Sequence, residues 1–545
     1  MKQNNMRRNS ILSLLALAAA MGQGIPALAQ VQDSLLLRDY QYIKQQDAWL
    51  TSGNASALTR YQAKNIAEAN LSLQYNRGGL TDYFESPEML RLGAAVESFY
   101  RVSRRTVVYG SIAYENANAW RMTGSAWINP TRKPFDMVEA TLDNPGKKHR
   151  DTYQLTGAVG VDLGKGFSLG AQVDYTGANY AKYKDLRHKN KLMDLTASVG
   201  LYAPVASWLN VGANYRYHRN TESITFSMYG KDDRVYNSLI SYGAMMGPVE
   251  QFGTKGYTDK SNEMPWVDDG NGVGLQLDFR LAEGLSFYNH FTYLYHKGYY
   301  GRKSPSTITY ANHKGHQFSY QGVLSYKHST TLHQLAVNVS TEKIENFGAT
   351  YRELINDNGA YYYEYYESVK TGQRRWATTD IDYTGRWGIR GELPTWTVQA
   401  GLHFQQRKQL GILYPYFRRQ SLKRTEVVLR GERNFFVGKG VLSAALGFSY
   451  AKGSGDVCED GAYVEPQDGQ SFPASMDAFL YREYQYLTAP QIGLHVSAKY
   501  AFLLPKVRLR MHVKAGFDYR KASETYAYSL GNHNTQLTFA VGCTF

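Results

Sequence analysis

The stretch KVRLRMHVKAGFDY, residues 506–519, alternates between apolar and polar side chains at nearly every position. In an extended strand successive side chains point to opposite faces, so one face of this segment is oily and the other is charged. The apolar face carries Val507, Leu509, Met511, Val513, Ala515, Phe517 and Tyr519. The charged face carries Lys506, Arg508, Arg510, His512, Lys514 and Asp518. The segment is therefore predicted to be a β-strand that separates two different environments.

The same alternation recurs from about residue 67 to the end of the chain, clearly at 70–75, 154–162 and 396–407. Strands of a soluble sandwich usually run about five or six residues, whereas a tilted membrane-crossing strand needs about nine to eleven. The alternating segments here have the greater length. They predict a membrane-spanning barrel in preference to a sandwich.

Short and long connections alternate between these segments, as expected when one rim of a barrel faces the periplasm and the other faces outside. The short connections are expected at 103–105, 164–166, 204–207, 282–284, 329–330, 391–394, 437–439 and 503–506. The long connections are expected at 78–88, 121–150, 181–189, 219–269, 298–312, 345–375, 410–420, 453–484 and 522–529. We predict an all-β, transmembrane, antiparallel up-and-down barrel of about 18 strands over residues 67–545, with 14 or 16 strands as alternatives. An even number places both termini at the periplasmic rim.

The composition supports this fold class. The 545 residues include 45 Tyr and 50 Gly but only 15 Pro, and 20% are charged. The mean hydropathy is −0.46, and after the N-terminal region no apolar run approaches the roughly 18 to 20 residues of a spanning helix. Cys458 and Cys543 are expected to be unpaired, at opposite ends of the molecule.

The N-terminus predicts export. Lys2, Arg7 and Arg8 precede an apolar run at 11–21, and Ala27-Leu28-Ala29 provides a small-residue cleavage site, so residues 1–29 are interpreted as a signal peptide. With the strand pattern, this predicts an integral protein of the bacterial outer membrane. Residues 30–66 are too apolar for a free tail, and they are expected either to plug the barrel or to form a strap on its periplasmic rim.

The last segment, residues 536–545, places Leu537, Phe539, Val541, Cys543 and Phe545 on one face. It resembles the C-terminal strand of bacterial outer-membrane barrels. That resemblance implies that Phe545 is part of a membrane-insertion signal read by the barrel-insertion machinery.

Two further stretches are similar to a family of uncharacterised Bacteroidota outer-membrane barrels. One is Asp47-Ala48-Trp49-Leu50 followed by residues 54–58, and the other is residues 124–130 followed by Pro134-Phe135-Asp136. The resemblance implies a location and a fold, and it brings no catalytic residues. Some such barrels resemble accessories of TonB-dependent uptake systems. Only residues 30–66 precede the first strand here, too few for the folded plug of a TonB-dependent receptor.

Charged residues on the polar face are expected to line a wet lumen. The basic candidates are Arg508, Arg510, His512, Lys514, His495 and Lys499, and the acidic ones are Asp162, Asp174 and Asp194. If the two groups face each other, a transverse field would orient dipolar solutes and favour anions near the basic wall. The alternative is a network of ion pairs that fills a closed barrel.

Three loop features are candidates for recognition. The run YYYEYYE contains Tyr361, Tyr362, Tyr363, Tyr365 and Tyr366, which form either a stacking surface or a strand that continues above the membrane. The acidic stretch 453–484 lacks the spacing of a calcium loop, so no metal site is predicted. Basic residues at 132–133, 147–150 and 182–191 are expected to meet lipopolysaccharide phosphates, and no nucleic-acid module is present.

The search for catalytic motifs finds neither G-x-S-x-G nor H-E-x-x-H, and His313 and His316 form only a weak pair. We therefore expect no enzyme and no cofactor, but a barrel that passes or helps capture small solutes. One alternative is a non-conducting barrel that docks a surface lipoprotein or a TonB-dependent receptor. Another is an outer-membrane lipid-modifying enzyme, whose Ser and His would leave little local pattern.

Overall fold

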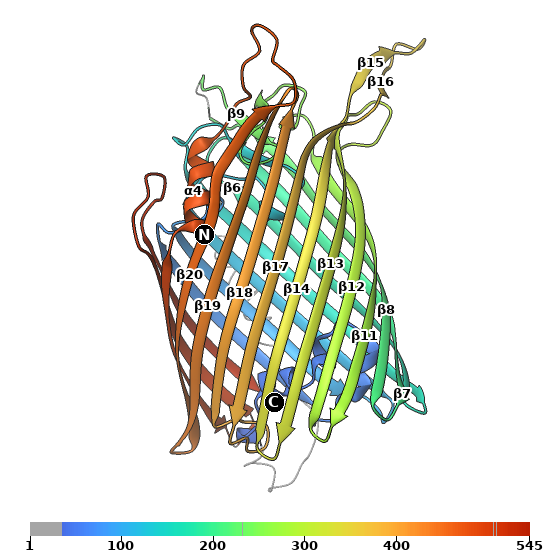
Figure 1. Cartoon of the computed structure of the whole chain (residues 1–545), viewed down its shortest axis with the longest axis vertical. Coiled ribbons are helices and arrows are strands. Elements are labelled where there is room, and N and C mark those ends of the chain that lie inside the picture. The colour runs from blue at the N-terminus through green and yellow to red at the C-terminus, as the bar shows by residue number, and fades with distance from the viewer. Residues whose placement is uncertain (1–34, 231–232, 505, 508) are drawn as a thin grey trace.

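Eighteen strands form one closed antiparallel sheet in the computed structural model, which describes residues 35–230, 233–504, 506–507 and 509–545. Each barrel strand pairs with the next along the chain, and the last pairs with the first to close the ring (Figure 1). At the seam the backbone N–H of Phe545 donates to the carbonyl of Ala67 at 3.0 Å, and that of Ala67 donates back at 2.9 Å. The predicted fold and the count of 18 are confirmed. The predicted signal peptide and Arg508 lie outside the described residues.

The barrel strands are β1 (Ile66–Gly78), β2 (Glu88–Arg101), β3 (Thr106–Met122), β5 (Gly146–Gly164), β6 (Phe167–Lys182), β7 (Arg187–Ala206), β8 (Leu209–Ser227), β11 (Met264–Ala282), β12 (Leu285–Gly301), β13 (Thr309–His328), β14 (Thr331–Gly348), β17 (Val369–Trp387), β18 (Trp396–Leu413), β19 (Tyr416–Val437), β20 (Gly440–Ala462), β21 (Gln491–Leu504), β22 (Leu509–Ala522) and β23 (His533–Thr544). Smaller elements lie in the N-terminal segment and in the connections. They are α3 (Tyr40–Gln45), η2 (Ala48–Thr51), η3 (Ala55–Arg60), η4 (Pro130–Arg132), β4 (Asp136–Glu139), β9 (Asn237–Ser241), β10 (Val249–Gln251), β15 (Tyr351–Ile355), β16 (Tyr361–Tyr365) and α4 (Asp477–Thr488).

All the predicted short connections lie at one end of the barrel, here called the short-turn end, and the others lie at the long-loop end. The wall both begins and ends at the short-turn end, as the even strand number requires. Several predicted long connections include residues of the neighbouring strands, as 219–269 does with the end of β8 and the start of β11, and two others show the error clearly. The one at 410–420 is only the turn Tyr414-Pro415, and in the predicted acidic loop Asp456, Glu459 and Asp460 belong to β20 while α4 follows. Polar strand residues beyond the apolar band lose the alternation that marks a strand, which explains both errors.

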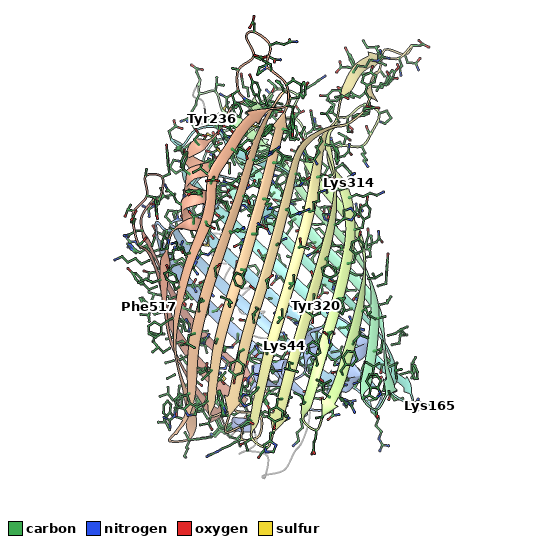
Figure 2. The ribbon with its side chains drawn as sticks, viewed as in Figure 1. Lys44, Lys165, Tyr236, Lys314, Tyr320 and Phe517 are labelled. Atoms are coloured by element: carbon green, nitrogen blue, oxygen red, sulfur yellow. The ribbon has the colours of Figure 1, made fainter. Side chains whose placement is uncertain are left out.

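The outward face of the wall is apolar. Leu71, Val513 and Phe517 are exposed on it, and Phe517 projects from the edge of the wall in Figure 2. Aromatic side chains border this surface near the short-turn end and again nearer the long-loop end, with Leu and Val between them. The exposed aromatic residues are Trp208, Tyr326 and Trp396 in the first group and Tyr153, Tyr215 and Tyr293 in the second. This arrangement matches the apolar band and flanking girdles of strands that face hydrocarbon.

None of the helices in the described part of the chain is long and apolar enough to cross a membrane. Both cysteines are free, Cys458 on the part of β20 near the long-loop end and Cys543 on β23 at the short-turn end.

Candidate functional site

The N-terminal segment, residues 35–65, lies inside the barrel at the short-turn end, where Figure 1 shows its helices in blue. Ion pairs join it to strands on several sides of the ring. Arg38 Nε lies 2.9 Å from Glu392 Oε2 in the β17–β18 turn, and Lys499 Nζ on β21 lies 3.5 Å from Asp39 Oδ2. Burial alone would raise the pKa of Asp39, but Lys499 and Arg510 hold it below its usual value. Charged contacts therefore contribute to holding the segment in the barrel.

Trp49 is an almost fully buried side chain of this contact. Its ring centroid lies 5.1 Å from those of Tyr202 and Tyr288, both in edge-on geometry, and its Nε1 donates to Asp278 Oδ2 at 3.0 Å. The guanidinium of Arg60 lies over the same ring at 5.8 Å and contacts Asp278 at 3.8 Å. Since Trp49 is only 2% exposed, one aromatic anchor joins the N-terminal segment to β7, β11 and β12.

A row of inward glycines lets the backbone of η3 approach the wall directly. Gly160, Gly170 and Gly200 are cross-strand neighbours on β5, β6 and β7, and Gly212 follows on β8. A Cβ atom on Gly170 would lie 2.1 Å from Ser56 N, and one on Gly200 would lie 2.1 Å from Asn54 Oδ1. Such distances exclude any larger residue without movement, so the wall is shaped to receive this segment.

At the long-loop end, connections fold inward and fill the other half of the lumen. β4, β9 and β10 form a small sheet, and Trp127, Phe135 and Met137 pack in a buried cluster with Trp266 and Tyr300 of the wall.

Two buried arginines of the wall secure these inward connections. The Arg374 guanidinium donates to the carbonyls of Pro130 at 3.0 Å and Lys133 at 2.9 Å. On the neighbouring strand, Arg407 forms a buried ion pair with Glu483 of α4.

Three of the basic residues predicted to face lipopolysaccharide are instead buried in this region. Lys133 Nζ lies 2.9 Å from Glu222 Oε2, Lys148 donates to the carbonyl of Ser125 at 2.7 Å, and Lys182 pairs with Glu139. Burial lowers the pKa of the Lys133 ammonium group, and Glu222 partly offsets that effect. The prediction is wrong for these three residues because the loop that carries Lys133 folds into the barrel, and Lys148 of β5 and Lys182 of β6 face it from the wall.

The predicted basic lumen residues that the structure describes, all but Arg508, do lie on the inward face, but most are engaged. Lys499 meets Asp39, Arg510 donates to the carbonyl of Arg38, and His512 Nε2 lies 2.9 Å from Asn70 Oδ1. His495 Nδ1 lies 2.6 Å from Asp518 Oδ1, and Lys514 shares the same face. Nearer the long-loop end, this part of the wall borders a cavity of about 570 Å³. The residues that line it carry both positive and negative charges. Its charged lining residues are Glu85, Arg91, Glu426, Arg430, His495, Asp518 and Arg520.

The predicted acidic lumen residues lie in separate places. Asp162 accepts from the backbone N–H of Gly164 at 2.8 Å in its own turn, at the short-turn end. Asp174 Oδ1 accepts from Thr156 at 2.8 Å, and Asp194 Oδ1 lies 2.9 Å from His218 Nε2. The acidic residues are thus bound to near neighbours on their own part of the wall.

The tyrosine run forms β16, which pairs with β15 in a hairpin that stands beyond the barrel rim (Figure 1). Tyr361, Tyr362, Tyr365 and Tyr366 are exposed, whereas Tyr363 hydrogen-bonds to Glu353 at 2.9 Å.

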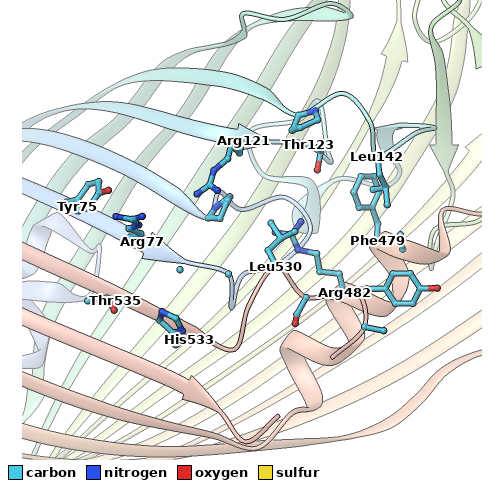
Figure 3. A pocket seen from close by; sticks show the side chains of 18 of the residues that line it. Tyr75, Arg77, Arg121, Thr123, Leu142, Phe479, Arg482, Leu530, His533 and Thr535 are labelled. Carbon is cyan, nitrogen blue, oxygen red and sulfur yellow. The ribbon is translucent and has the colours of Figure 1, made fainter. Parts of the chain in front are cut away.

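On the outward side near the same rim, a hollow of about 970 Å³ lies beside β1, β23 and α4. Figure 3 shows Arg77 and Arg121 on one side of it and Leu142 and Phe479 on the other.

Sequence reasoning missed the inward folding of residues 123–145. The available signal was the number of large apolar residues in a connection taken to be a surface loop: Trp127, Ile128, Phe135, Met137 and Val138. These residues include part of the stretch that carries the family resemblance, and the other part, around Trp49, lies in the N-terminal segment. Both stretches therefore fill the lumen, one from each end.

Similar solved structures are distant. The FrpB iron transporter from Neisseria meningitidis has a TM-score of 0.42 at 10% identity, covering 90% of this chain and 83% of that chain. The ferric preacinetobactin receptor BauA from Acinetobacter baumannii has a TM-score of 0.39 at 10% identity, covering 89% and 80%. TM-scores this low carry no information on the solute or partner of this chain.

Comparison by sequence is informative about family alone. None of the curated proteins matches the chain. The model of a family of unknown function (DUF6850) matches residues 55–545, which include η3 and the entire wall. The chain therefore belongs to this family of unknown function, DUF6850.

Proposed function

We propose that this protein is an integral outer-membrane barrel, with both termini on the periplasmic side, that captures and passes small solutes through a gated lumen. The N-terminal segment is the periplasmic plug, and the inward connections between β3 and β5 and between β8 and β11 form the outer gate. The protein is not an enzyme. The observation that carries this proposal is the placement of residues 35–65 inside a wall that closes without them.

The chemistry of the plug contacts supports movement. Its holding contacts include ion pairs and hydrogen bonds such as Arg38 with Glu392 and Lys499 with Asp39, which water can replace. The wall strands are hydrogen-bonded directly to one another, and the plug contributes no strand to the wall. Displacement of the plug therefore leaves the barrel intact. Barrels with about 16 to 18 strands are wide enough for an aqueous channel.

The lumen cavity bordered by β2, β19, β21 and β22 indicates the class of solute. Arg91, Arg430 and Arg520 lie on its lining together with Glu426 and Asp518. A surface with both signs of charge suits a small dipolar or zwitterionic molecule better than an apolar one, because each charged end finds a partner.

The membrane placement has its own support. The apolar outward band with aromatic residues at both borders fits a bilayer, and a closed ring leaves no strand edge unpaired in hydrocarbon. Phe545, at the seam of the barrel, is the residue that the insertion machinery reads. Lipopolysaccharide is the lipid partner, with its phosphates beside Arg77 and Arg121 and its acyl chains against the adjoining apolar surface.

Single-channel recording tests the gate. The chain lacking residues 30–60 should give larger and steadier currents in planar bilayers than the wild type, because the periplasmic half of the lumen is then empty. The control lacks residues 356–360, the tip of the β15–β16 hairpin outside the lumen, and should conduct like the wild type. A folded deletion variant whose currents do not exceed those of the wild type would contradict the proposal.

A second candidate is a non-conducting barrel that docks a surface lipoprotein or a TonB-dependent receptor. The exposed tyrosines of the β15–β16 hairpin favour it, because a projecting aromatic surface is suited to contact with another protein. Co-purification from native membranes distinguishes the two: a stoichiometric partner that is lost when Tyr361 and Tyr366 become Ser supports docking.

A further inference from the structure

Three side chains with metal-binding atoms converge inside the long-loop half of the lumen. They are Asp268 on β11, His296 on β12 and His313 on β13, three neighbouring strands, and each is 4% exposed. Asp268 Oδ1 lies 2.8 Å from His296 Nδ1 and 2.8 Å from His313 Nε2. One ligand atom from each residue lies within 4.8 Å of the others.

The spacing suits a single small ion. Divalent first-row metals bind imidazole nitrogen at about 2.0 to 2.1 Å and carboxylate oxygen at about 2.0 to 2.2 Å. Three ligand atoms this close together can therefore reach one ion after small rotations of the side chains. Two imidazoles and one carboxylate are donors that favour zinc and its neighbours over calcium or magnesium.

Glycines on the facing strands make room for both rings. His296 pairs across the sheet with Gly270 on β11 and Gly315 on β13, and His313 pairs with Gly298 on β12. A Cβ atom on Gly315 would lie 2.1 Å from His296 Nε2, and one on Gly298 would lie 2.7 Å from His313 Cε1. Larger residues at these positions would push the imidazoles away from Asp268.

Surrounding groups hold the rings in orientation. His313 stacks on Trp266 with ring centroids 5.3 Å apart and an interplanar angle of 13°. His296 Nε2 has no hydrogen-bond partner, and its nearest carboxylate oxygen, Glu342 Oε1, is 3.6 Å away. Metal-bound histidines commonly direct their second nitrogen at such a carboxylate, which orients the ring and raises its basicity.

A plain hydrogen-bonded triad is the competing explanation, because both histidines can donate to the one Asp268 oxygen. It leaves His296 Nε2 without a partner in a buried site, which is unfavourable. Lys133 is the nearby cation, and its Nζ is engaged with Glu222 at 2.9 Å and the Trp266 ring at 3.5 Å. Its charge is thus neutralised by Glu222. Glu342 is paired through its other oxygen with Arg132, so Asp268 is the carboxylate whose charge balances an ion.

We propose that Asp268, His296 and His313 form a binding site for a divalent transition-metal ion, zinc or a close neighbour, within the lumen. The site goes beyond the proposed transport function and does not depend on it. Asp268 Oδ1, His296 Nδ1 and His313 Nε2 supply three ligands, and Glu342 orients His296. An ion bound there joins β11, β12 and β13 beneath the outer gate.

The test uses the full mature chain without an affinity tag, stripped of metal by a chelator and titrated with ZnCl₂ in a calorimeter. We expect one equivalent to bind in the wild type and none at this site in His313→Ala or Asp268→Asn. Glu342→Gln, which removes the orienting carboxylate together with its ion pair to Arg132, should weaken binding by about 10- to 100-fold. The matched control is His316→Ala, on the same strand but on the outward face, where its ring contacts Tyr293 at 2.7 Å.

A spectroscopic measurement keeps the test independent of folding defects. Co²⁺ bound to the wild type and to His316→Ala should give the same visible absorption bands, with nitrogen ligation in X-ray absorption spectra. Each variant is first checked for the heat-modifiable gel mobility of an intact barrel. Failure of the folded wild type to bind one equivalent, or equal binding by folded His313→Ala, would overturn the proposal.

Discussion

The substitution Trp49→Ala tests the plug most directly, because Trp49 joins the N-terminal segment to three strands but is not itself part of the wall. Replacing a buried Trp by Ala costs about 3 to 5 kcal/mol. The ring is 2% exposed, and its two edge-on tyrosine contacts and its bond to Asp278 are all made with the wall. The loss therefore weakens docking of the plug to the barrel.

A tenfold change in an equilibrium constant corresponds to about 1.4 kcal/mol, so the released population should rise roughly 100- to several-thousand-fold. Trp49→Phe keeps most of the ring and loses the charge-assisted hydrogen bond, worth about 1.5 to 3 kcal/mol, so its effect should be intermediate. Trp208→Ala is the control, because Trp208 faces outward and is 54% exposed.

Two measurements on the barrel in bilayers follow the change. The first is the frequency of single-channel openings, and the second is the rate at which a protease added on the periplasmic side cleaves residues 35–65. Both should rise in the order Trp208→Ala, Trp49→Phe, Trp49→Ala. If proteolysis accelerates and the openings do not, the N-terminal segment is not what closes the lumen.

Three other predictions concern the contact of α4 with the wall, the lipid partner and assembly. Arg407→Ala leaves Glu483 as an uncompensated buried charge and should destabilise the α4 contact by about 3 to 5 kcal/mol, seen as faster proteolysis at 463–490, whereas the Arg407→Met, Glu483→Met pair should restore resistance. Arg77→Gln with Arg121→Gln should lower the lipopolysaccharide that co-purifies with the barrel, and an unchanged ratio would refute that site. Deletion of Phe545 should reduce the heat-modifiable barrel in outer-membrane fractions, with no change in export to the periplasm.

The wall was predictable because every side chain in it faces either the apolar band or the interior. Residues 506–519 show both faces in the sequence, and the predicted short connections fall within a few residues of the observed ones. The prediction lost accuracy where strands extend past the apolar band. Arg418 and Gln420 are ordinary strand residues of β19, but their polarity resembled that of a loop.

The contents of the lumen were not predictable in the same way. Whether a connection turns inward depends on contacts with residues that are distant in the sequence. Arg374, for example, donates a hydrogen bond to the carbonyl of Pro130, which is 244 positions earlier in the chain. Likewise, His296 and His313 contact Asp268 only because three strands align in one register. The closeness of His313 and His316 in the sequence was misleading, because their rings lie on opposite faces of the wall. The alternation in the sequence determines which face of the wall each residue occupies, but it does not determine which residues on that face come into contact.

The inward glycines at 160, 170 and 200 also constrain how long their strands can be. Because side chains alternate with a period of two, one inserted residue on the N-terminal side of Gly170 would turn it toward lipid and present Leu169 or Ala171 to η3 instead. The same slip would turn Gln172 and Asp174 toward lipid, and the strand could no longer admit the N-terminal segment. Seating of that segment therefore requires the observed alignment of β5, β6 and β7.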